Sequence, residues 1–337
     1  MDFLYSADND YFDILGYITA ICLLPILNEH MKKFLSRVIL FFMIIAALLI
    51  CGEYVVRRIP NAYATKRDAI AEYGHETATV VLGSSHTYYG VVADSMPNTL
   101  NLANISQAFE YDYRVLDRYI DSLPSLRHVI IPVSYFSFFD APFETTDNRN
   151  LEAYYRLYLD IDKYHHLSRA DFEICSFPSY SGKLKSFLMR KQGPQTSPKG
   201  FGLDYLGRQS EEHIKSTAQT AAERHSNMAN GNEAYQRLWF EKLIEMCIDR
   251  GIQPVLITTP VTRDYAKLLD NKQVERTRYL VQLYRKKYSL PYYDFSEAEG
   301  FTYDDFHDAD HLNRDGAIKF TRLLNSALDN QTDKRCN

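Results

Sequence analysis

Two short blocks, far apart in the chain, combine the residue types needed for nucleophilic catalysis. One reads Gly-Ser-Ser-His at 83–86, directly after an apolar run, and the other reads Asp-Ala-Asp-His at 308–311. A carboxylate three residues before a histidine can accept a hydrogen bond from one imidazole nitrogen, which leaves the other nitrogen free to take a proton from a serine. We therefore expect Ser85 to be a nucleophile, His311 its base and Asp308 the carboxylate that orients the base.

Each block follows a segment with the pattern of a β-strand, and such segments alternate with helical patterns along the chain. This alternation predicts an α/β fold, a flavodoxin-like three-layer sandwich in which a parallel sheet of about five strands has helices on both faces. Reactive side chains gather at the carboxyl ends of the strands in such sheets, so the two blocks are expected to meet there. The expected strands are 77–83, 99–105, 128–133, 252–258 and 290–295, and the expected helices are 109–120, 235–250, 262–287 and a last one that begins near Asn313.

Two further turns follow expected strands, at 104–107 and 132–135. Both can aim N–H or hydroxyl donors at the oxyanion that forms when an ester carbonyl is attacked. His86 and Tyr135 are candidates for contacts with the substrate, although His86 is equally suited to capping the helix that starts at the nucleophile.

The composition narrows the function further. The chain has 337 residues, with 38 Lys and Arg against 43 Asp and Glu, and a formal net charge of −5. This mildly acidic balance argues against a nucleic-acid-binding surface. The five cysteines show neither a Cys-x-x-Cys pair nor the spacing of zinc ligands. We therefore expect no cofactor, no metal and no nucleic-acid partner.

The N-terminal region is strongly apolar. Residues 38–56 are long enough to cross a bilayer core of roughly 30 Å as a helix, and three basic residues precede them within 32–37. We predict an anchor at 38–56 in the bacterial cytoplasmic membrane, with the bulk of the chain outside the cytoplasm by the positive-inside rule. A second apolar run at 14–27 leaves two alternatives, a hairpin of two spanning helices or translation that begins at Met31.

These patterns suggest domain boundaries. Residues 1–58 are the membrane segment, 59–76 a juxtamembrane linker, and 77–330 an enzyme-like domain interrupted by an aromatic-rich insertion at 137–231. The alternatives for the apolar segment are a buried core helix and a lipid anchor at Cys51.

Aromatic faces can stack on sugar rings, so the rings of the insertion either bind a glycan or pack in its core. The candidates are Tyr154, Tyr155, Tyr158, Phe201 and Tyr205.

The two blocks resemble those of the SGNH (GDSL-type) hydrolases, which carry a nucleophile in a Gly-Asp-Ser-like block near the first strand and an Asp-x-x-His block near the C-terminus. The resemblance covers residues 78–328, with the insertion interrupting it, and implies the same catalytic triad. Gln107 stands where the family has a glycine N–H, and Ser134 stands where it has an asparagine. The resemblance thus implies that Ser85, Gln107 and Ser134 provide the oxyanion donors.

A membrane anchor ahead of a Gly-Ser-Ser-His block resembles a subgroup of that family. Its members assist the acylation of envelope polymers, as in alginate O-acetylation and teichoic-acid D-alanylation, beside a multispanning membrane O-acyltransferase. The resemblance implies an extracytoplasmic serine esterase or acyltransferase acting on acyl groups, O-acetyl groups above all, of an envelope polysaccharide. Two alternatives stay open. One is a catalytically degenerate partner protein of the acyltransferase, and the other is a metal-dependent hydrolase that uses the acidic segment 304–311.

Overall fold

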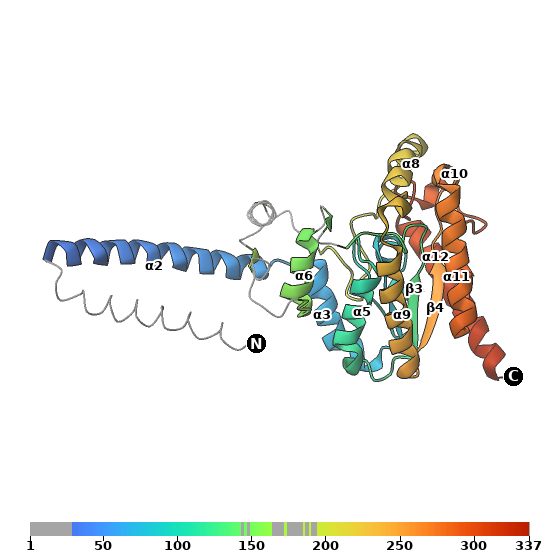
Figure 1. Ribbon diagram of the computed structural model, residues 1–337, viewed down its shortest axis with the longest axis horizontal. Coiled ribbons are helices and arrows are strands. Elements are labelled where there is room, and N and C mark those ends of the chain that lie inside the picture. Colours follow the sequence, from blue (N-terminus) through green and yellow to red (C-terminus); the bar gives the residue numbers. More distant parts are fainter. Residues whose placement is uncertain are drawn as a thin grey trace, which may run out of the picture. The chain divides into compact units, whose positions relative to one another are not determined.

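The computed structural model describes residues 29–142, 145–146, 149–163, 172–173, 185, 189 and 194–336. The chain divides after Arg58 into two compact units (Figure 1). The upstream apolar run at 14–27 lies outside the described residues, so neither alternative for it is tested.

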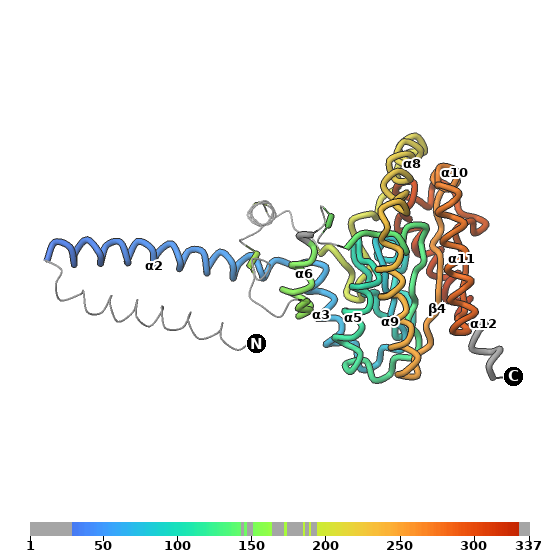
Figure 2. Tube along the Cα trace, viewed as in Figure 1, coloured from blue at the N-terminus to red at the C-terminus, as the bar shows by residue number. Residues whose placement is uncertain are grey.

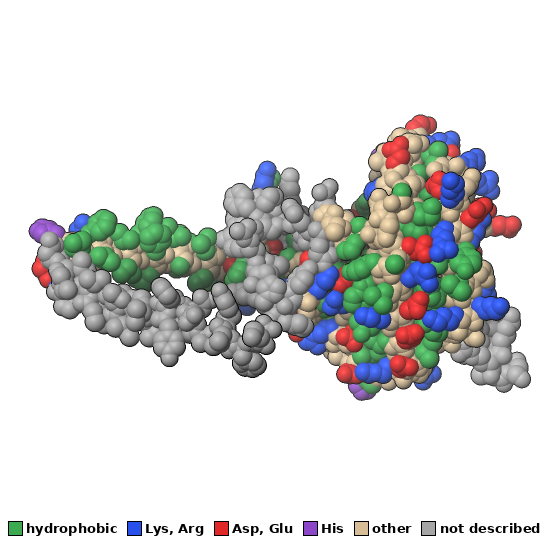
Figure 3. All heavy atoms as spheres, viewed as in Figure 1, with side chains coloured by type: hydrophobic (Ala, Val, Ile, Leu, Met, Phe, Trp, Pro, Cys, Tyr) green, Lys and Arg blue, Asp and Glu red, His purple; other side chains and the backbone are tan. Residues whose placement is uncertain are grey.

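Helix α2 (Glu29–Arg57) and the turn residue Arg58 make up the described part of the first unit. An 18-residue window of this helix has a mean hydropathy of 2.7, and none of that window is buried. Figure 3 shows hydrophobic side chains along most of its length. The helix is long and apolar enough to be a membrane anchor or a signal sequence, and it contains the whole of the predicted anchor at 38–56. Cys51, the candidate for lipidation, is exposed on it.

The second unit is built on a parallel sheet of five strands in the order β2-β1-β3-β4-β5. This is the strand order of a flavodoxin-like sheet, and it confirms the predicted fold class. Each predicted strand contains an observed one, shorter at one or both ends. The strands are β1 (Thr79–Val81), β2 (Thr99–Asn101), β3 (His128–Pro132), β4 (Gln253–Thr258) and β5 (Tyr292–Asp294).

Helices cover both faces of the sheet. Successive residues of a strand point to opposite sides, so each strand contributes side chains to two cores. Val129 enters a core shared with α5 (Phe109–Tyr119) and α9 (Glu233–Asp249), which pack side by side (Figure 2). Ile130, the next residue, enters a second core shared with α12 (Arg314–Cys336). Burial on both faces explains why the strands read as continuous apolar runs rather than as alternating patterns.

The segment 262–287, predicted as one helix, is two helices. Helix α10 (Arg263–Leu268) ends before Leu269, whose backbone is extended, and α11 (Asn271–Tyr288) begins after Asp270. The Asp270 carboxylate accepts a hydrogen bond from a backbone N–H in the first turn of α11 and so caps it. Because this local cap competes with continuation of the preceding helix, the prediction of a single helix was wrong.

The stretch 59–76, expected to be a juxtamembrane linker, instead contributes helix α3 (Ala62–Tyr73) to the core of the second unit. One side of the helix is buried and carries Lys66, which is 1% exposed. The Lys66 ammonium donates to Oδ1 of Asn104 at 2.9 Å and to the carbonyl of Ala103. Burial lowers the pKa of Lys66 well below its ordinary value. Helix α3 thus belongs to the folded unit and contacts the turn after β2.

The described part of the insertion at 137–231 contains helices α6 (Arg149–Leu159) and α8 (Glu211–His225). Three of its candidate sugar-binding rings are almost fully buried in the two apolar cores, so they are packing residues and have no face for a glycan. The three are Tyr155, Tyr158 and Phe201.

Gly83 allows the chain to turn between β1 and α4 (Ser85–Tyr88). Its φ of +107° favours glycine, and a Cβ there would lie 2.0 Å from Cγ of Pro132. We expect Gly83→Ala to lower the free energy of unfolding by about 2–4 kcal/mol, since backbone strain and overpacking add. Denaturant unfolding measures this. Gly207→Ala is the control, because a Cβ there meets nothing within 4 Å. Equal effects of the two substitutions would contradict the prediction.

Candidate active site

Ser85 follows the carboxyl end of β1, which is an interior strand of the sheet, and begins the short helix α4. Strand β2, which follows β1 along the chain, lies on one side of it, and β3 lies on the other side. A parallel sheet opens a crevice where the strand order reverses in this way, and ligands of such sheets bind in that crevice. The topology therefore puts the serine at the position in this fold best suited to meet a substrate.

His311 comes from the connection between β5 and α12, although β3 and β4 separate β5 from β1. The first and fifth strands are therefore not neighbours, and the connection itself carries His311 back to Ser85. An isolated antiparallel bridge between Phe306 and Leu312 closes this connection into a tight loop. Asn313 then caps the first turn of α12, as predicted, because its Oδ1 accepts a backbone N–H at 3.1 Å.

Ser85, His311 and Asp308 form a continuous chain of hydrogen bonds. Ser85 Oγ lies 2.8 Å from His311 Nε2, and His311 Nδ1 lies 2.9 and 3.0 Å from the two carboxylate oxygens of Asp308. Because an ionised carboxylate can only accept, Nδ1 carries the proton and Nε2 is left to accept the hydrogen of the serine. His311 is thus within hydrogen-bond distance of both Ser85 and Asp308, as the predicted catalytic roles require.

Local backbone geometry holds Asp308 in place. Its Oδ1 also accepts the backbone N–H groups of Asp310 at 3.1 Å and of His311 at 2.8 Å. Aspartate forms turns of this kind with the residues that directly follow it, so the arrangement depends on sequence spacing alone. That locality is the reason the three-residue spacing was informative.

His311 is surrounded by negative charge. Its side chain is 7% exposed, and burial by itself would lower its pKa, but the charge of Asp310 and the hydrogen bond to Asp308 hold that pKa above its ordinary value. Asp310 Oδ2 lies 3.7 Å from His311 Nδ1. The site therefore favours the imidazolium, the form that His311 takes once it has accepted a proton.

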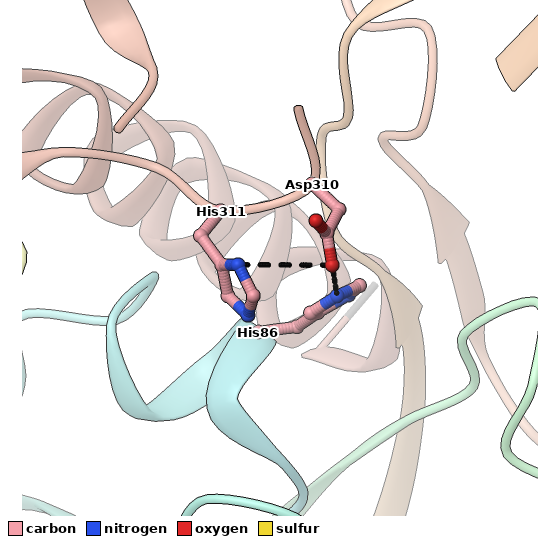
Figure 4. Close-up of side chains that lie close together, drawn as sticks. All are labelled: His86, Asp310 and His311. Carbon is pink, nitrogen blue, oxygen red and sulfur yellow. Dashed lines mark hydrogen bonds and ion pairs between the residues drawn. The ribbon is translucent and has the colours of Figure 1, made fainter. Parts of the chain in front are cut away.

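The sequence predicts a substrate contact for His86, but the structure buries this side chain, which is 4% exposed. Its Nε2 lies 3.1 Å from Asp310 Oδ2 (Figure 4). Its Nδ1 lies 3.3 Å from Ser134 Oγ and 3.4 Å from Thr259 Oγ1. Burial lowers the pKa of His86 in spite of the nearby carboxylate, so the ring is neutral at pH 7. His86 is part of the wall of the site and presents no open face to a substrate.

Two residues of α8 that the sequence did not single out complete the surroundings of this carboxylate. Arg224 Nη2 lies 3.4 Å from Asp310 Oδ2, and 58% of the Arg224 side chain is exposed. His225 Nδ1 lies 2.8 Å from the hydroxyl of Tyr265, and burial lowers the pKa of His225 well below its ordinary value. Both residues come from the insertion, where neither a strand end nor a motif marks them.

The three predicted oxyanion donors differ in availability. The backbone N–H of Gln107 donates to the carbonyl of Asn104 at 3.2 Å. The backbone N–H of Ser134 donates to Ser137 Oγ at 2.9 Å, and the Ser134 hydroxyl lies against an imidazole nitrogen. The backbone N–H of Ser85, in the first turn of α4, forms no hydrogen bond with the described residues. Only the Ser85 N–H is therefore available among the three.

Tyr135, the second predicted substrate contact, links two helices instead. Its hydroxyl lies 3.0 Å from Ser226 Oγ and accepts the backbone N–H of Asp270 at 2.9 Å. Tyr135 is 9% exposed. Its polar atom is thus used between the end of α8 and the start of α11, which corrects the expectation that it binds substrate.

Among the aromatic candidates of the insertion, Tyr205 reaches His311, with 5.4 Å between the ring centroids. Its ring is stacked on Tyr89 at 4.1 Å and on His307 at 4.0 Å, so both of its faces are covered. A sugar therefore cannot stack on Tyr205 in this arrangement. The remaining candidate, Tyr154, stacks on a tyrosine of α3.

The metal-dependent alternative is represented by a small cluster. Within the described residues, His86, Asp310 and His311 bring three potential ligand atoms within 4.8 Å of one another, and the acidic residues of 304–308 do not belong to it. Both ring nitrogens of His311 already have hydrogen-bond partners, and the guanidinium of Arg224 lies 3.4 Å from the Asp310 carboxylate. A metal ion would have to displace these partners and tolerate the neighbouring cation, so these residues do not fit a metal site.

A second buried carboxyl group, that of Asp112, forms a hydrogen bond with the backbone of the Gly-Ser-Ser turn. Asp112 of α5 accepts the backbone N–H of Gly83 at 2.8 Å and the side-chain amide of Gln107 at 2.7 Å. Burial raises the pKa of Asp112 to about 7, although both hydrogen bonds favour the ionised form. The carboxyl group joins the turn after β1 to the turn after β2.

Comparison with known proteins shows only distant likeness. No protein-family profile matches the sequence, and no curated protein matches it. A solved structure from Bacteroides fragilis NCTC 9343, provisionally assigned as an acylhydrolase, is similar with a TM-score of 0.37 and 12% identity over 80% of this chain and 95% of that chain. One from Streptococcus pneumonia, provisionally assigned as a platelet activating factor, has a TM-score of 0.33 and 9% identity over 86% and 98%. Likeness at this level assigns no activity.

The raised pKa of Asp112 predicts a pH-dependent loss of stability. An unfolded aspartate ionises near pH 4, whereas the folded group keeps its proton up to about pH 7. The stability contributed by protonated Asp112 is therefore complete below pH 4 and is lost as pH rises through 7. Asp112→Asn keeps the acceptor oxygen, so we expect it to stabilise the protein by about 3 kcal/mol more at pH 8 than at pH 4.

Denaturant unfolding at the two pH values measures this difference. Asp117→Asn is the matched control, because Asp117 lies on the same helix and is exposed. The prediction fails if Asp112→Asn changes the free energy of unfolding by the same amount at pH 4 and pH 8.

Proposed function

We propose that this protein is a membrane-anchored, extracytoplasmic serine esterase or acyltransferase that acts on acyl groups, O-acetyl groups above all, of an envelope glycan. The observation that carries the proposal is the 2.8 Å contact between Ser85 Oγ and His311 Nε2. Asp308 on the other side of the imidazole and the position of Ser85 at a strand end support it.

The proposed reaction has two steps. His311 Nε2 takes the Ser85 proton as Oγ attacks the carbonyl carbon of an ester, and the tetrahedral intermediate collapses as His311 gives that proton to the departing alcohol. The acyl group, now esterified to Ser85, is then attacked by a sugar hydroxyl or by water, whose proton passes to His311 and finally to Ser85 Oγ. Transfer and hydrolysis use the same residues and differ only in the second nucleophile.

The charges and donors around His311 support these proton transfers. The bond from Nδ1 to Asp308 keeps Nε2 in the accepting form, and the negative charges near the ring stabilise the imidazolium between the two transfers. The oxygen of the ester carbonyl gains negative charge during each attack and needs a donor. The backbone N–H of Ser85 is the donor assigned to it here.

The location and the substrate are proposed from the first unit and from the resemblance to envelope-acylating proteins. Helix α2 has the length and composition of an anchor, and the basic residues at its start favour an extracytoplasmic second unit. An esterase held at that surface meets envelope polymers. We assign it a polysaccharide substrate and a multispanning membrane O-acyltransferase as its partner.

A second candidate function is that of a catalytically inactive partner of such an acyltransferase. It is favoured by the engagement of the Gln107 and Ser134 N–H groups within the protein. Loss of a single oxyanion donor costs about 10²–10³ in rate, so a site short of donors could bind an acylated polymer without turning it over.

Substitution of the nucleophile separates the two candidates. We expect Ser85→Ala in the full-length protein to lower the hydrolysis of a small activated acetyl ester by about 10³-fold or more. A fluorophosphonate should label the unsubstituted protein and not this variant. Ser84→Ala is the matched control, because the neighbouring serine makes no capping hydrogen bond with its side chain. Turnover that is unchanged in Ser85→Ala excludes Ser85, and an unsubstituted protein with neither turnover nor labelling supports the inactive partner.

The pH dependence of the activity should follow His311. The base must be neutral to accept the serine proton, and its surroundings hold its pKa above the ordinary value of about 6.5. We expect kcat/KM for the same ester to rise with pH and to reach half its plateau above pH 6.5, because the imidazolium form persists beyond that point. A half-plateau at or below pH 6.5 would contradict this assignment of the base.

A further inference from the structure

A second contact runs beside the Ser85–His311 contact. His86 directly follows the serine in α4, and Asp310 directly precedes His311 in the loop, and these two neighbours are themselves paired. His86 Nε2 lies 3.1 Å from Asp310 Oδ2, and the rings of His86 and His311 meet edge to face with 5.0 Å between centroids (Figure 4). The helix of the proposed nucleophile and the loop of the proposed base are therefore joined at two adjacent positions.

The second contact is more deeply buried than the first. The side chains of His86 and Asp310 are 3% and 1% exposed, whereas that of His311 is 7% exposed and Ser85 is half-buried. Although burial would raise the pKa of Asp310, the neighbouring His311 and His86 hold it well below its ordinary value. Removing an ionised carboxylate from water is unfavourable, and its partners must offset that loss of hydration. The charge is therefore retained at a cost, which points to a use beyond packing.

Titratable and charged groups from five parts of the chain face the Asp310 carboxylate. Arg224 is the full cation among them and lies 3.4 Å away, while His225, whose Nδ1 lies 3.9 Å away, is kept neutral by burial. Among the described residues the set is His86 of α4, Tyr205 of the insertion, Arg224 and His225 of α8, Tyr265 of α10, and Asp308 and His311 of the loop itself.

His86 also connects the nucleophile helix to two other loops. Its Nδ1 faces the hydroxyls of Ser134, after β3, and of Thr259, after β4, at 3.3 and 3.4 Å. One imidazole thus contacts the loops after β3, β4 and β5 while it is covalently next to Ser85. A residue that only capped α4 would not need this second set of partners.

We propose that His86 and Asp310 are positioning residues that hold the nucleophile helix and the loop of the base at a fixed separation, a role that rests on the function proposed above. The contact keeps Ser85 Oγ within reach of His311 Nε2 when the imidazole changes its protonation. The Asp310 charge acts on His311 at 3.7 Å and favours its protonated form.

Asp310→Asn tests the charge while it keeps the shape and the acceptor oxygen. In the full-length protein we expect kcat for a small activated acetyl ester to fall about 10- to 100-fold, with KM nearly unchanged, because positioning acts on the reaction step. We also expect the half-plateau of kcat/KM to move to lower pH, since His311 loses a negative charge that favours its protonated form. Asp304→Asn is the matched control, an exposed aspartate of the same connection.

His86 provides an independent test of the contact itself. His86→Gln retains a side-chain N–H donor for Asp310, whereas His86→Leu fills a similar volume without one. We expect His86→Gln to retain at least tenfold more kcat than His86→Leu. Thermal unfolding of each variant reports whether it has folded. If a His86 variant has not folded, Thr259→Val takes its place in the comparison, because it removes only the hydroxyl that faces the same imidazole.

The outcomes distinguish this inference from the proposed function. If the unsubstituted protein has no activity that Ser85→Ala removes, the proposed function fails and the inference fails with it. If that activity exists, a pH profile of Asp310→Asn that coincides with the profile of Asp304→Asn overturns the inference alone. Equal kcat in His86→Gln and His86→Leu has the same consequence.

Discussion

A serine hydroxyl and an imidazole nitrogen must lie within about 3 Å of each other to exchange a proton, and in this chain the two groups stand 226 positions apart. The sheet provides one half of this geometry, because β1 ends inside the strand order, at the point where the order reverses. The loop closed by the Phe306–Leu312 bridge provides the other half, because it returns from the far edge of the sheet. The remaining features of the site keep these two halves together.

Beside the Ser85–His311 contact lies one buried negative group, the carboxylate of Asp310. Asp310 is surrounded by two imidazoles that burial keeps neutral, His86 and His225, and by the guanidinium of Arg224. Such a carboxylate is stable only because its hydrogen bonds and a cation offset the loss of water. A second buried acid, Asp112, is accommodated differently, because burial raises its pKa to about 7 beneath the turn that carries Ser85. The site thus contains two buried carboxyl groups whose pKa values are shifted in opposite directions.

The fold could be predicted because its signals are local. Short apolar runs that end in turns locate all five strands. Asn313 predicts the start of the last helix, because a side-chain cap acts within one turn. The errors also have local causes. The cap at Asp270 divides a segment whose periodicity suggested one helix. Helix α3 was predicted as a linker because its buried face mixes small apolar residues with Lys66. A lysine is usually exposed, so the sequence does not indicate that this position is buried.

The sequence alone determined the pieces that depend on neighbouring residues: the order of strands and helices, the apolar N-terminal helix, and the pairing of Asp308 with His311, which lie within one turn of backbone. Tertiary structure decided everything that joins separate segments. It paired His86 with Asp310 and placed Arg224 of the insertion beside the same carboxylate. It also covered both faces of Tyr205, which the sequence suggested as a sugar-binding residue. The physical reason is that hydrogen bonds and ring contacts act over a few ångströms, so a partner far along the chain becomes visible only when the backbone has been folded around the sheet.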